Sequence, residues 1–206
     1  MSSPVAVDIF VEDRTHEEFL VPMVLRIARE ESVTISPRVR AARGGHGTAV
    51  TELELYQHFV LKGVTGTTVP DVLIAGIDGN CSNFARKKKE IEDAILAPFS
   101  GRLVVACPDP HVERWYLADP DSFCQVLGVR PRVTKRKCER GLYKRELADA
   151  VKRGGHRPTL GGIEFAAELV ERMDLYRAGK NERSLKAFVD DLRSSLRTLP
   201  RVVRAI

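Results

Sequence analysis

The sequence predicts an α/β fold, in which a four-stranded, mainly parallel sheet with helices on both faces precedes a helical C-terminal extension. Two observations predict it. Short apolar segments rich in β-branched residues alternate with longer segments of helical periodicity over residues 1–107, and only helical patterns follow. The chain has 206 residues, of which 43% are hydrophobic, enough for one ordinary core. We expect an α/β domain at 1–127 and a basic helical extension at 128–206 packed on it.

The first half of the chain supplies the sheet. Residues 5–11 (VAVDIFV) and 71–77 (DVLIAGI) are almost continuously apolar, as strands buried on both faces are. Gly63 and Pro98 are placed to end the helices that precede them. The strands are expected at residues 5–11, 33–41, 71–77 and 102–107, and the helices at 15–31, 49–62 and 82–97.

The second half of the chain is predicted to be helical. Apolar residues recur at helical spacing in four segments, which are residues 111–126, 141–153, 161–176 and 181–196. Trp115 is more typical of a core residue, packing its helix on the sheet, than of a residue that stacks on a base.

The composition excludes several classes of protein. No apolar run approaches the ~18 residues of a membrane helix, and the N-terminal residues lack the pattern of a secretory signal. The four cysteines form no Cys-x-x-Cys pair, so we expect reduced thiols and no zinc site. We therefore expect a cytoplasmic enzyme or binding protein.

The net charge of +5 is unevenly spread. Residues 130–157 contain eleven basic and three acidic side chains, a net charge of +8, whereas residues 1–129 carry a net charge of −5. A dense basic segment favours binding to the phosphates of nucleic acid, although a solvated helix face without a partner has the same composition. The nucleic-acid-binding candidates in it are Lys135, Arg136, Lys137, Lys144 and Arg145.

Acidic and amide side chains follow three of the expected strands. Glu12 ends the first strand, Asp78 and Asn80 follow the third, and Glu113 lies shortly after the fourth. Because ligands of open parallel sheets lie beyond the carboxyl ends of the strands, these oxygens suit Mg²⁺ or Mn²⁺. The alternative is that acidic residues here only cap the following helices, which would explain Asp13 well.

These residues resemble the motifs of Toprim domains. Val-Glu at 11–12, with a helix starting near residue 15, is similar to the first Toprim motif, and Asp-Gly-Asn at 78–80 is similar to the second. The segment PDPHVERWYLAD at 108–119 resembles that of small OLD-like and RloB-like bacterial Toprim proteins linked to phage defence. The resemblance covers roughly residues 5–120. Asp13 replaces the usual glycine of the first motif, and Asn80 replaces the second aspartate of the other.

The resemblance implies Mg²⁺- or Mn²⁺-dependent hydrolysis of phosphodiester bonds in DNA or RNA. Glu12 and Asp78 would be the catalytic residues, and Glu12, Asp78, Asn80 and Glu113 the metal ligands. The loop residues Gly44, Gly45 and His46 also look like those of the family, and their N–H groups are candidates to bind phosphate. A plain tight turn explains the same glycines.

Three functions remain open from the sequence. The first is a Toprim-like nuclease that acts in phage defence. The second is a catalytically degenerate, nucleic-acid-binding or regulatory protein that works with a partner ATPase, with Asn80 marking the lost catalysis. The third is a protein that binds nucleotides or small phosphates, since a fold alone does not set function.

Overall fold

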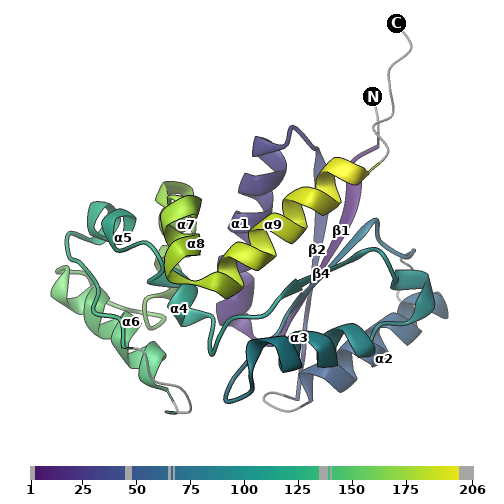
Figure 1. Ribbon diagram of the computed structural model, residues 1–206, viewed down its shortest axis with the longest axis horizontal. Helices are drawn as coiled ribbons and strands as arrows, with labels where there is room; N and C mark the ends of the chain where they lie inside the picture. The colour runs from purple at the N-terminus through teal and green to yellow at the C-terminus, as the bar shows by residue number, and fades with distance from the viewer. Residues whose placement is uncertain are drawn as a thin grey trace, which may run out of the picture.

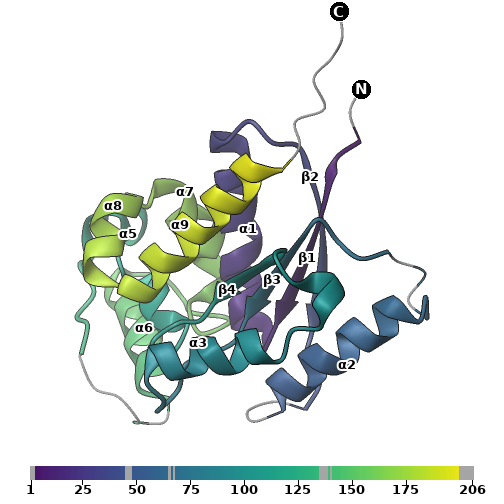
Figure 2. The ribbon, with the colours of Figure 1, turned by 45° about the vertical axis from the view of Figure 1, so that its right-hand side comes forward.

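The computed structural model describes residues 3–44, 48–64, 66, 68–134, 139 and 141–199. Four parallel strands form one sheet in the order β2-β1-β3-β4 (Figure 1 shows the sheet, and Figure 2 labels all four strands). They are β1 (Val5–Val11), β2 (Ile35–Ala41), β3 (Val72–Gly76) and β4 (Leu103–Ala106). The predicted fold class is confirmed, and the bounds of the first strand agree with the sequence pattern to the residue.

The two faces of the sheet bury different parts of β1, because successive side chains of a strand point to opposite faces. Val7, Ile9 and Val11 belong to the larger core cluster, and Phe10 belongs to the smaller one. The helices α1 (Arg14–Glu30) and α9 (Arg183–Thr198) cover the first face. The helices α2 (Ala49–Leu61) and α3 (Phe84–Asp93) cover the second, followed by a 3₁₀ turn at Ala97–Phe99 (Figure 2).

The second half contains more and shorter helices than the periodicity predicts. They are α4 (Glu113–Tyr116), α5 (Pro120–Leu127), α6 (Leu142–Arg153), a 3₁₀ turn at Ile163–Phe165, α7 (Ala166–Arg172) and α8 (Leu175–Asn181), followed by α9. The expected helix 111–126 is interrupted because Pro120, which lacks a backbone N–H, begins a new helix. Within the described residues no helix has the length and apolar content needed to cross a membrane.

One core joins the residues on both sides of the predicted boundary at 127/128. Buried side chains of α7 and α9 share the larger cluster with β1 and α1. Trp115 stacks on Phe188 of α9, with ring centroids 5.6 Å apart and an interplanar angle of 16°. Trp115 is therefore a core residue, as expected, and the C-terminal helices complete one side of the α/β layer.

We expect Ser184→Ala to lower the free energy of unfolding by about 1–3 kcal/mol, the usual cost of a buried donor left unsatisfied. The indole N–H of Trp115 donates to the Ser184 hydroxyl at 2.9 Å, and both residues are buried. Urea unfolding measures the change, and Ser194→Ala on the exposed side of the same helix is the control. Equal stability of the two variants would contradict a role for this hydrogen bond.

Candidate metal centre

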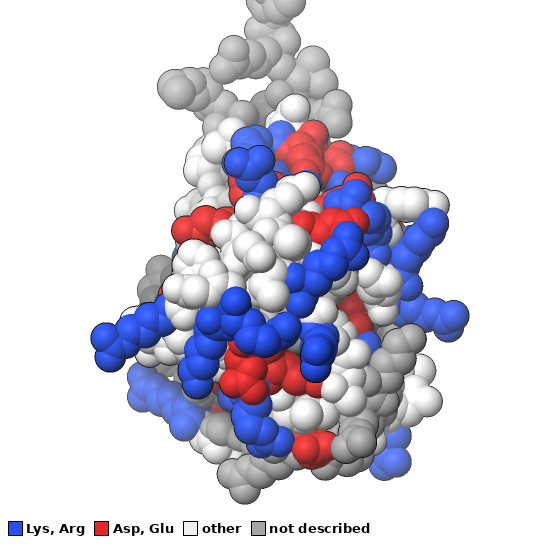
Figure 3. Space-filling view, turned by 90° about the vertical axis from the view of Figure 1, so that its left-hand side faces the viewer, with Lys and Arg blue, Asp and Glu red and all other residues white. Residues whose placement is uncertain are grey.

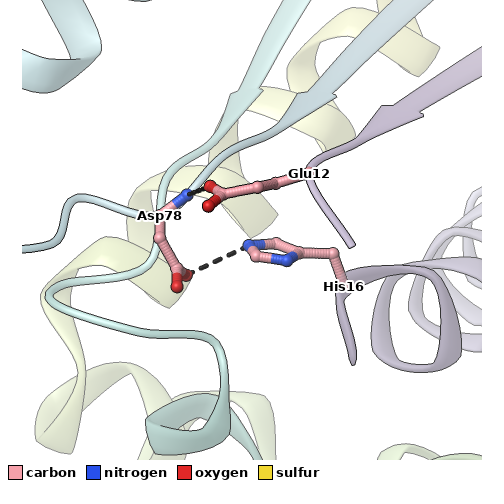
Figure 4. Close-up of side chains that lie close together, drawn as sticks. All are labelled: Glu12, His16 and Asp78. Carbon is pink, nitrogen blue, oxygen red and sulfur yellow. Dashed lines mark hydrogen bonds and ion pairs between the residues drawn. The ribbon is translucent and has the colours of Figure 1, made fainter. Parts of the chain in front are cut away.

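The candidate site lies where β1 and β3 end at the same edge of the sheet. Val11 pairs with Gly76, so Glu12 and Asp78 leave the sheet close together. The Glu12 carboxylate accepts a hydrogen bond from the backbone N–H of Asp78 at 2.9 Å (Figure 4). Both side chains are buried, with exposures of 5% and 6%. The parallel topology thus brings together the two residues that the sequence predicts as catalytic.

His16, in the first turn of α1, completes the group. Its Nε2 lies 3.1 Å from Asp78 Oδ1, and its Nδ1 lies 2.9 Å from Asp13 Oδ1 (Figure 4 draws the contact with Asp78). Burial lowers the pKa of His16, but the charge of Asp78 and the contacts with both carboxylates outweigh it and raise the pKa to about 10. His16 is therefore an imidazolium at neutral pH, and it neutralises the two carboxylates that flank it.

Asp13 is the N-cap of α1. Its carboxylate accepts the backbone N–H of His16 at 3.2 Å as well as the imidazole contact. The helix-capping interpretation of Asp13 is thus confirmed. Burial raises the pKa of Asp13, but its bonds to His16 outweigh this and hold the pKa far below its usual range. The same contacts fix the orientation of the His16 ring.

Asp78 is held from a second side by the segment that follows β4. The His111 Nδ1 lies 2.8 Å from Asp78 Oδ2, and the backbone N–H of Val112 donates to Oδ1 at 2.9 Å. Burial raises the pKa of Asp78, but the charge of His16 and the contacts with both histidines outweigh it and lower that pKa. The hydrogen bond to Asp78 raises the pKa of His111. Asp78 is therefore a charged and positionally fixed carboxylate.

Glu113 and Lys144 form the outer part of the site. Glu113 is 2% exposed, and burial together with the charge of Asp78 raises its pKa. The Lys144 ammonium of α6 lies 3.7 Å from Glu113 Oε1 and 3.8 Å from Asp13 Oδ2. One residue of the predicted basic segment therefore reaches the acidic cluster, which links the two oppositely charged parts of the chain.

Glu12, His16 and Asp78 could hold a metal ion. One ligand atom from each lies within 4.8 Å of the other two, and all three side chains are buried. Two carboxylate oxygens and one imidazole nitrogen suit Mn²⁺, Fe²⁺ or Zn²⁺, whereas Mg²⁺ prefers oxygen ligands alone. Binding through His16 requires that its ring lose the extra proton, because a metal ligates only neutral imidazole.

We expect the affinity for Mn²⁺ to rise about tenfold per pH unit between about pH 6.5 and 8, because each bound ion displaces one proton from His16. The pKa of about 10 keeps the ring protonated throughout this range. Calorimetric titration with Mn²⁺ measures the affinity, and His16→Gln is the matched variant without the proton. A pH-independent affinity of the unaltered chain would contradict ligation by His16.

Asn80 lies beside the group of Glu12, His16 and Asp78. Its backbone adopts a positive φ of 51°, its N–H donates to the Pro110 carbonyl at 2.8 Å, and its Nδ2 donates to the Asp78 carbonyl at 3.3 Å. Its Oδ1 is buried without a hydrogen-bond partner among the described residues. The three-residue group of His and acidic ligands does not include Glu113, and ligation by Asn80 and by Glu113 stays a prediction.

Of the remaining residues that are predicted to bind nucleic acid, the structure describes some and not others. Lys135, Arg136 and Lys137 lie outside the described residues, and Arg145 pairs with Glu139 at 3.2 Å. Figure 3 views the molecule from the side on which Figure 1 places α5 and α6, and basic side chains surround an acidic group there. The basic charge on this face is therefore interrupted by acidic side chains.

In the loop predicted to bind phosphate, a carboxylate of the protein itself accepts the backbone N–H groups. Gly45 and His46 lie outside the described residues, but the N–H groups of Arg43 and Gly44 both donate to the Glu52 carboxylate, each at 2.6 Å. The Thr48 hydroxyl donates to the same carboxylate at 2.9 Å. Glu52 thus occupies the position relative to Gly44 that a phosphate was expected to take.

The expectation of free thiols is confirmed at two cysteines and is wrong at a third. Cys107 and Cys124 are free, whereas Cys81 is disulfide-bonded, so the expectation of reduced thiols is wrong at Cys81. Cys138 lies outside the described residues. Pairing depends on how close the thiols come in the folded chain, which their spacing in sequence does not reveal.

The sequence prediction missed His16 and His111. His16 stands four residues after Glu12, in the first turn of the helix that leaves the predicted site. His111 stands three residues after Pro108, in the segment that follows β4. Their position just beyond strand ends that already carry acidic residues was the available signal.

Comparisons with protein-family models, with curated proteins and with solved structures found no match.

Proposed function

We propose that this chain is a metal-dependent phosphodiesterase that cleaves nucleic acid at the Glu12–His16–Asp78 site. The observation that carries the proposal is the convergence of these three buried ligands at the carboxyl edge of a parallel sheet. Two buried carboxylates and an imidazole, each held by contacts with neighbouring groups, would form a preorganised metal site. The resemblance of the strand-end motifs to Toprim domains supplies the class of reaction.

A bound divalent ion would polarise the phosphate and lower the pKa of the attacking water. The protein residues have separate roles. Asp78, held by His111 and by the Val112 N–H, is the fixed ligand. Glu12 is the ligand or general base that takes a proton from water. The donor set favours Mn²⁺ over Mg²⁺ because it includes His16.

Nucleic acid is the proposed substrate because an exposed lysine of the basic segment reaches the acidic side chains beside the site. Lys144 is 63% exposed while its ammonium approaches Asp13 and Glu113. A phosphate that enters the site would meet this ammonium next to the proposed metal ligands. Residues 130–157, with a net charge of +8, would bind the neighbouring phosphates of the backbone.

The second candidate function is a regulatory protein that binds nucleic acid without cleaving it and works with a partner ATPase. Asn80 favours it, because an amide that donates to the Asp78 carbonyl stands where the Toprim motif has a second acid. A protein with this function would use the same nucleic-acid-binding residues but would not hydrolyse the bound nucleic acid.

Incubation of the full chain with labelled DNA and RNA, in Mn²⁺, Mg²⁺ or a chelator, tests the proposal. We expect cleavage in Mn²⁺, slower cleavage in Mg²⁺ and none in the chelator. Salt-dependent binding without cleavage would support the regulatory function instead. Neither binding nor cleavage would overturn both and favour a protein that binds small phosphates.

A further inference from the structure

Arg40, on the edge strand β2, differs from the other partly buried arginines that the structure describes. Six arginines are partly buried there, and five of them form an ion pair with a carboxylate, namely Arg26, Arg38, Arg102, Arg114 and Arg193. The Arg40 guanidinium forms no ion pair with any described residue, and it donates to the Val39 carbonyl at 3.1 Å. Withdrawing a charge from water costs free energy that a counter-ion offsets, so this guanidinium is suited to bind an anion.

Arg40 lies on the same face of the sheet as Glu12. Arg40 pairs with Phe10 across β2 and β1, and Phe10 belongs to the core cluster beneath α2 and α3. Glu12 extends the ladder of β1, because its N–H donates to the Gly76 carbonyl at 2.8 Å. Side chains alternate along a strand, so Glu12, two residues after Phe10, points to this face as well. Arg40 and Glu12 are therefore diagonal neighbours on adjacent strands, a separation of about 7–8 Å that a long side chain can span.

The sheet order places Arg40 and Lys144 on opposite sides of the candidate metal centre. The metal ligands follow β1 and β3, and β2 is the neighbour of β1 at one edge of the sheet. Lys144 of α6 contacts Glu113, which follows β4 at the other edge. In Figure 2, α6 and α2 also lie on opposite sides of the strands. A polyanion that crosses the carboxyl ends of the strands would meet a cation on each side of the proposed metal.

We propose that Arg40 binds a backbone phosphate of the nucleic-acid substrate, next to the phosphate that is cleaved. This inference rests on the proposed function, because it assigns a second contact to the same substrate. A guanidinium suits this role, since its planar N–H groups match two oxygens of a phosphate. The substrate then runs across the ends of the strands from Lys144 to Arg40, and the cleaved phosphate lies at the metal centre between them.

Binding of short labelled DNA and RNA duplexes to the full chain, measured in a chelator at several salt concentrations, tests the role of Arg40. We expect Arg40→Gln to raise the dissociation constant about tenfold, the effect of losing one charge-assisted hydrogen-bonded contact. It should also reduce the slope of log affinity against log salt by about one. Arg40→Lys keeps the charge and should stay within about threefold of the original chain. The control Arg29→Gln removes the same charge near the end of α1, about 20 Å from His16 at its start, and should leave both quantities unchanged.

Urea unfolding without nucleic acid separates phosphate binding from a structural role. Arg38→Gln should destabilise the fold, because it removes the ion-pair partner of the buried Asp8 carboxylate, whereas Arg40→Gln removes no ion pair and should not. An equal loss of stability in both variants would assign Arg40 to the fold and overturn the proposal.

The outcomes distinguish this inference from the proposed function. If the original chain binds the duplexes and Arg40→Gln binds them as Arg29→Gln does, the inference fails while the proposed function stands. Binding that depends on Arg40, without cleavage when Mn²⁺ is added, would support the inference and refute the hydrolysis. An original chain that does not bind the duplexes would overturn both.

Discussion

Glu12→Gln is expected to lower the Mn²⁺-dependent hydrolysis of nucleic acid by about 10²- to 10⁴-fold, which is the usual contribution of a general acid or base. The amide oxygen of the introduced glutamine can still accept the Asp78 N–H that Glu12 accepts at 2.9 Å, so the geometry of the strand ends is retained. Asp78→Asn is expected to have at least as large an effect, because it removes the carboxylate that contacts both histidines. Initial rates on labelled DNA and RNA measure both effects.

The matched control is Asp93→Asn at the end of α3. Asp93 pairs with Lys89 on an exposed helix face at 2.9 Å and takes no part in the proposed site, so its loss should leave the rate unchanged. Calorimetry with Mn²⁺ then separates the two roles of Glu12. If Glu12 is a ligand, Glu12→Gln weakens the binding of Mn²⁺ as well as the rate, whereas a general base affects the rate alone. Full activity of either variant would refute the assignment of that residue.

The sequence predicted the sheet well because buried parallel strands have a strong local signature. Val5–Val11 is nearly all apolar, and its bounds agree with the pattern. The prediction was less accurate where local periodicity competes with chain geometry. Apolar spacing continues through residues 111–126, but Pro120 divides that segment into α4 and α5.

The candidate site was predicted only in part, for a similar reason. Glu12 and Asp78 follow strands, so topology alone brings them together. His16 contacts Asp78 only because α1 begins at Arg14 and is capped by Asp13, a detail of the turn rather than of hydrophobic periodicity. The contact of Lys144 with Glu113 depends on how α6 packs, and no local pattern in either segment encodes that contact.

His16→Ala is expected to lower the free energy of unfolding of the metal-free chain by about 3–5 kcal/mol at pH 6, the usual cost of leaving one partner of a buried ion pair alone. His16 is completely buried between Asp13 and Asp78, so the alanine substitution removes the imidazolium that pairs with both carboxylates. Urea unfolding in the presence of a chelator measures the change. Exposed His58→Ala is the control, since its side chain lies outside the core.

The effect of pH follows from the pKa of His16, which rises from 6.5 in the unfolded chain to about 10 in the folded protein. A raised pKa means that the folded state binds the proton more tightly. The stabilisation is therefore complete below about pH 6.5, declines as the pH increases, and is lost above about pH 10. His16→Ala should lack this decline, so the two unfolding curves should converge toward high pH. A constant difference from pH 6 to pH 10 would show that the proton on His16 does not stabilise the fold.

Metal binding should reverse this pH dependence, because a divalent ion and the proton on His16 both neutralise Asp78. Added Mn²⁺ is expected to stabilise the chain more at pH 8 than at pH 6, since fewer protons compete at the higher pH. His16→Ala removes both the proton and one ligand, so it should lose most of the Mn²⁺-dependent increase in the unfolding midpoint. If Mn²⁺ stabilised that variant as much as the original chain, His16 would lose its assignment as a ligand of the ion.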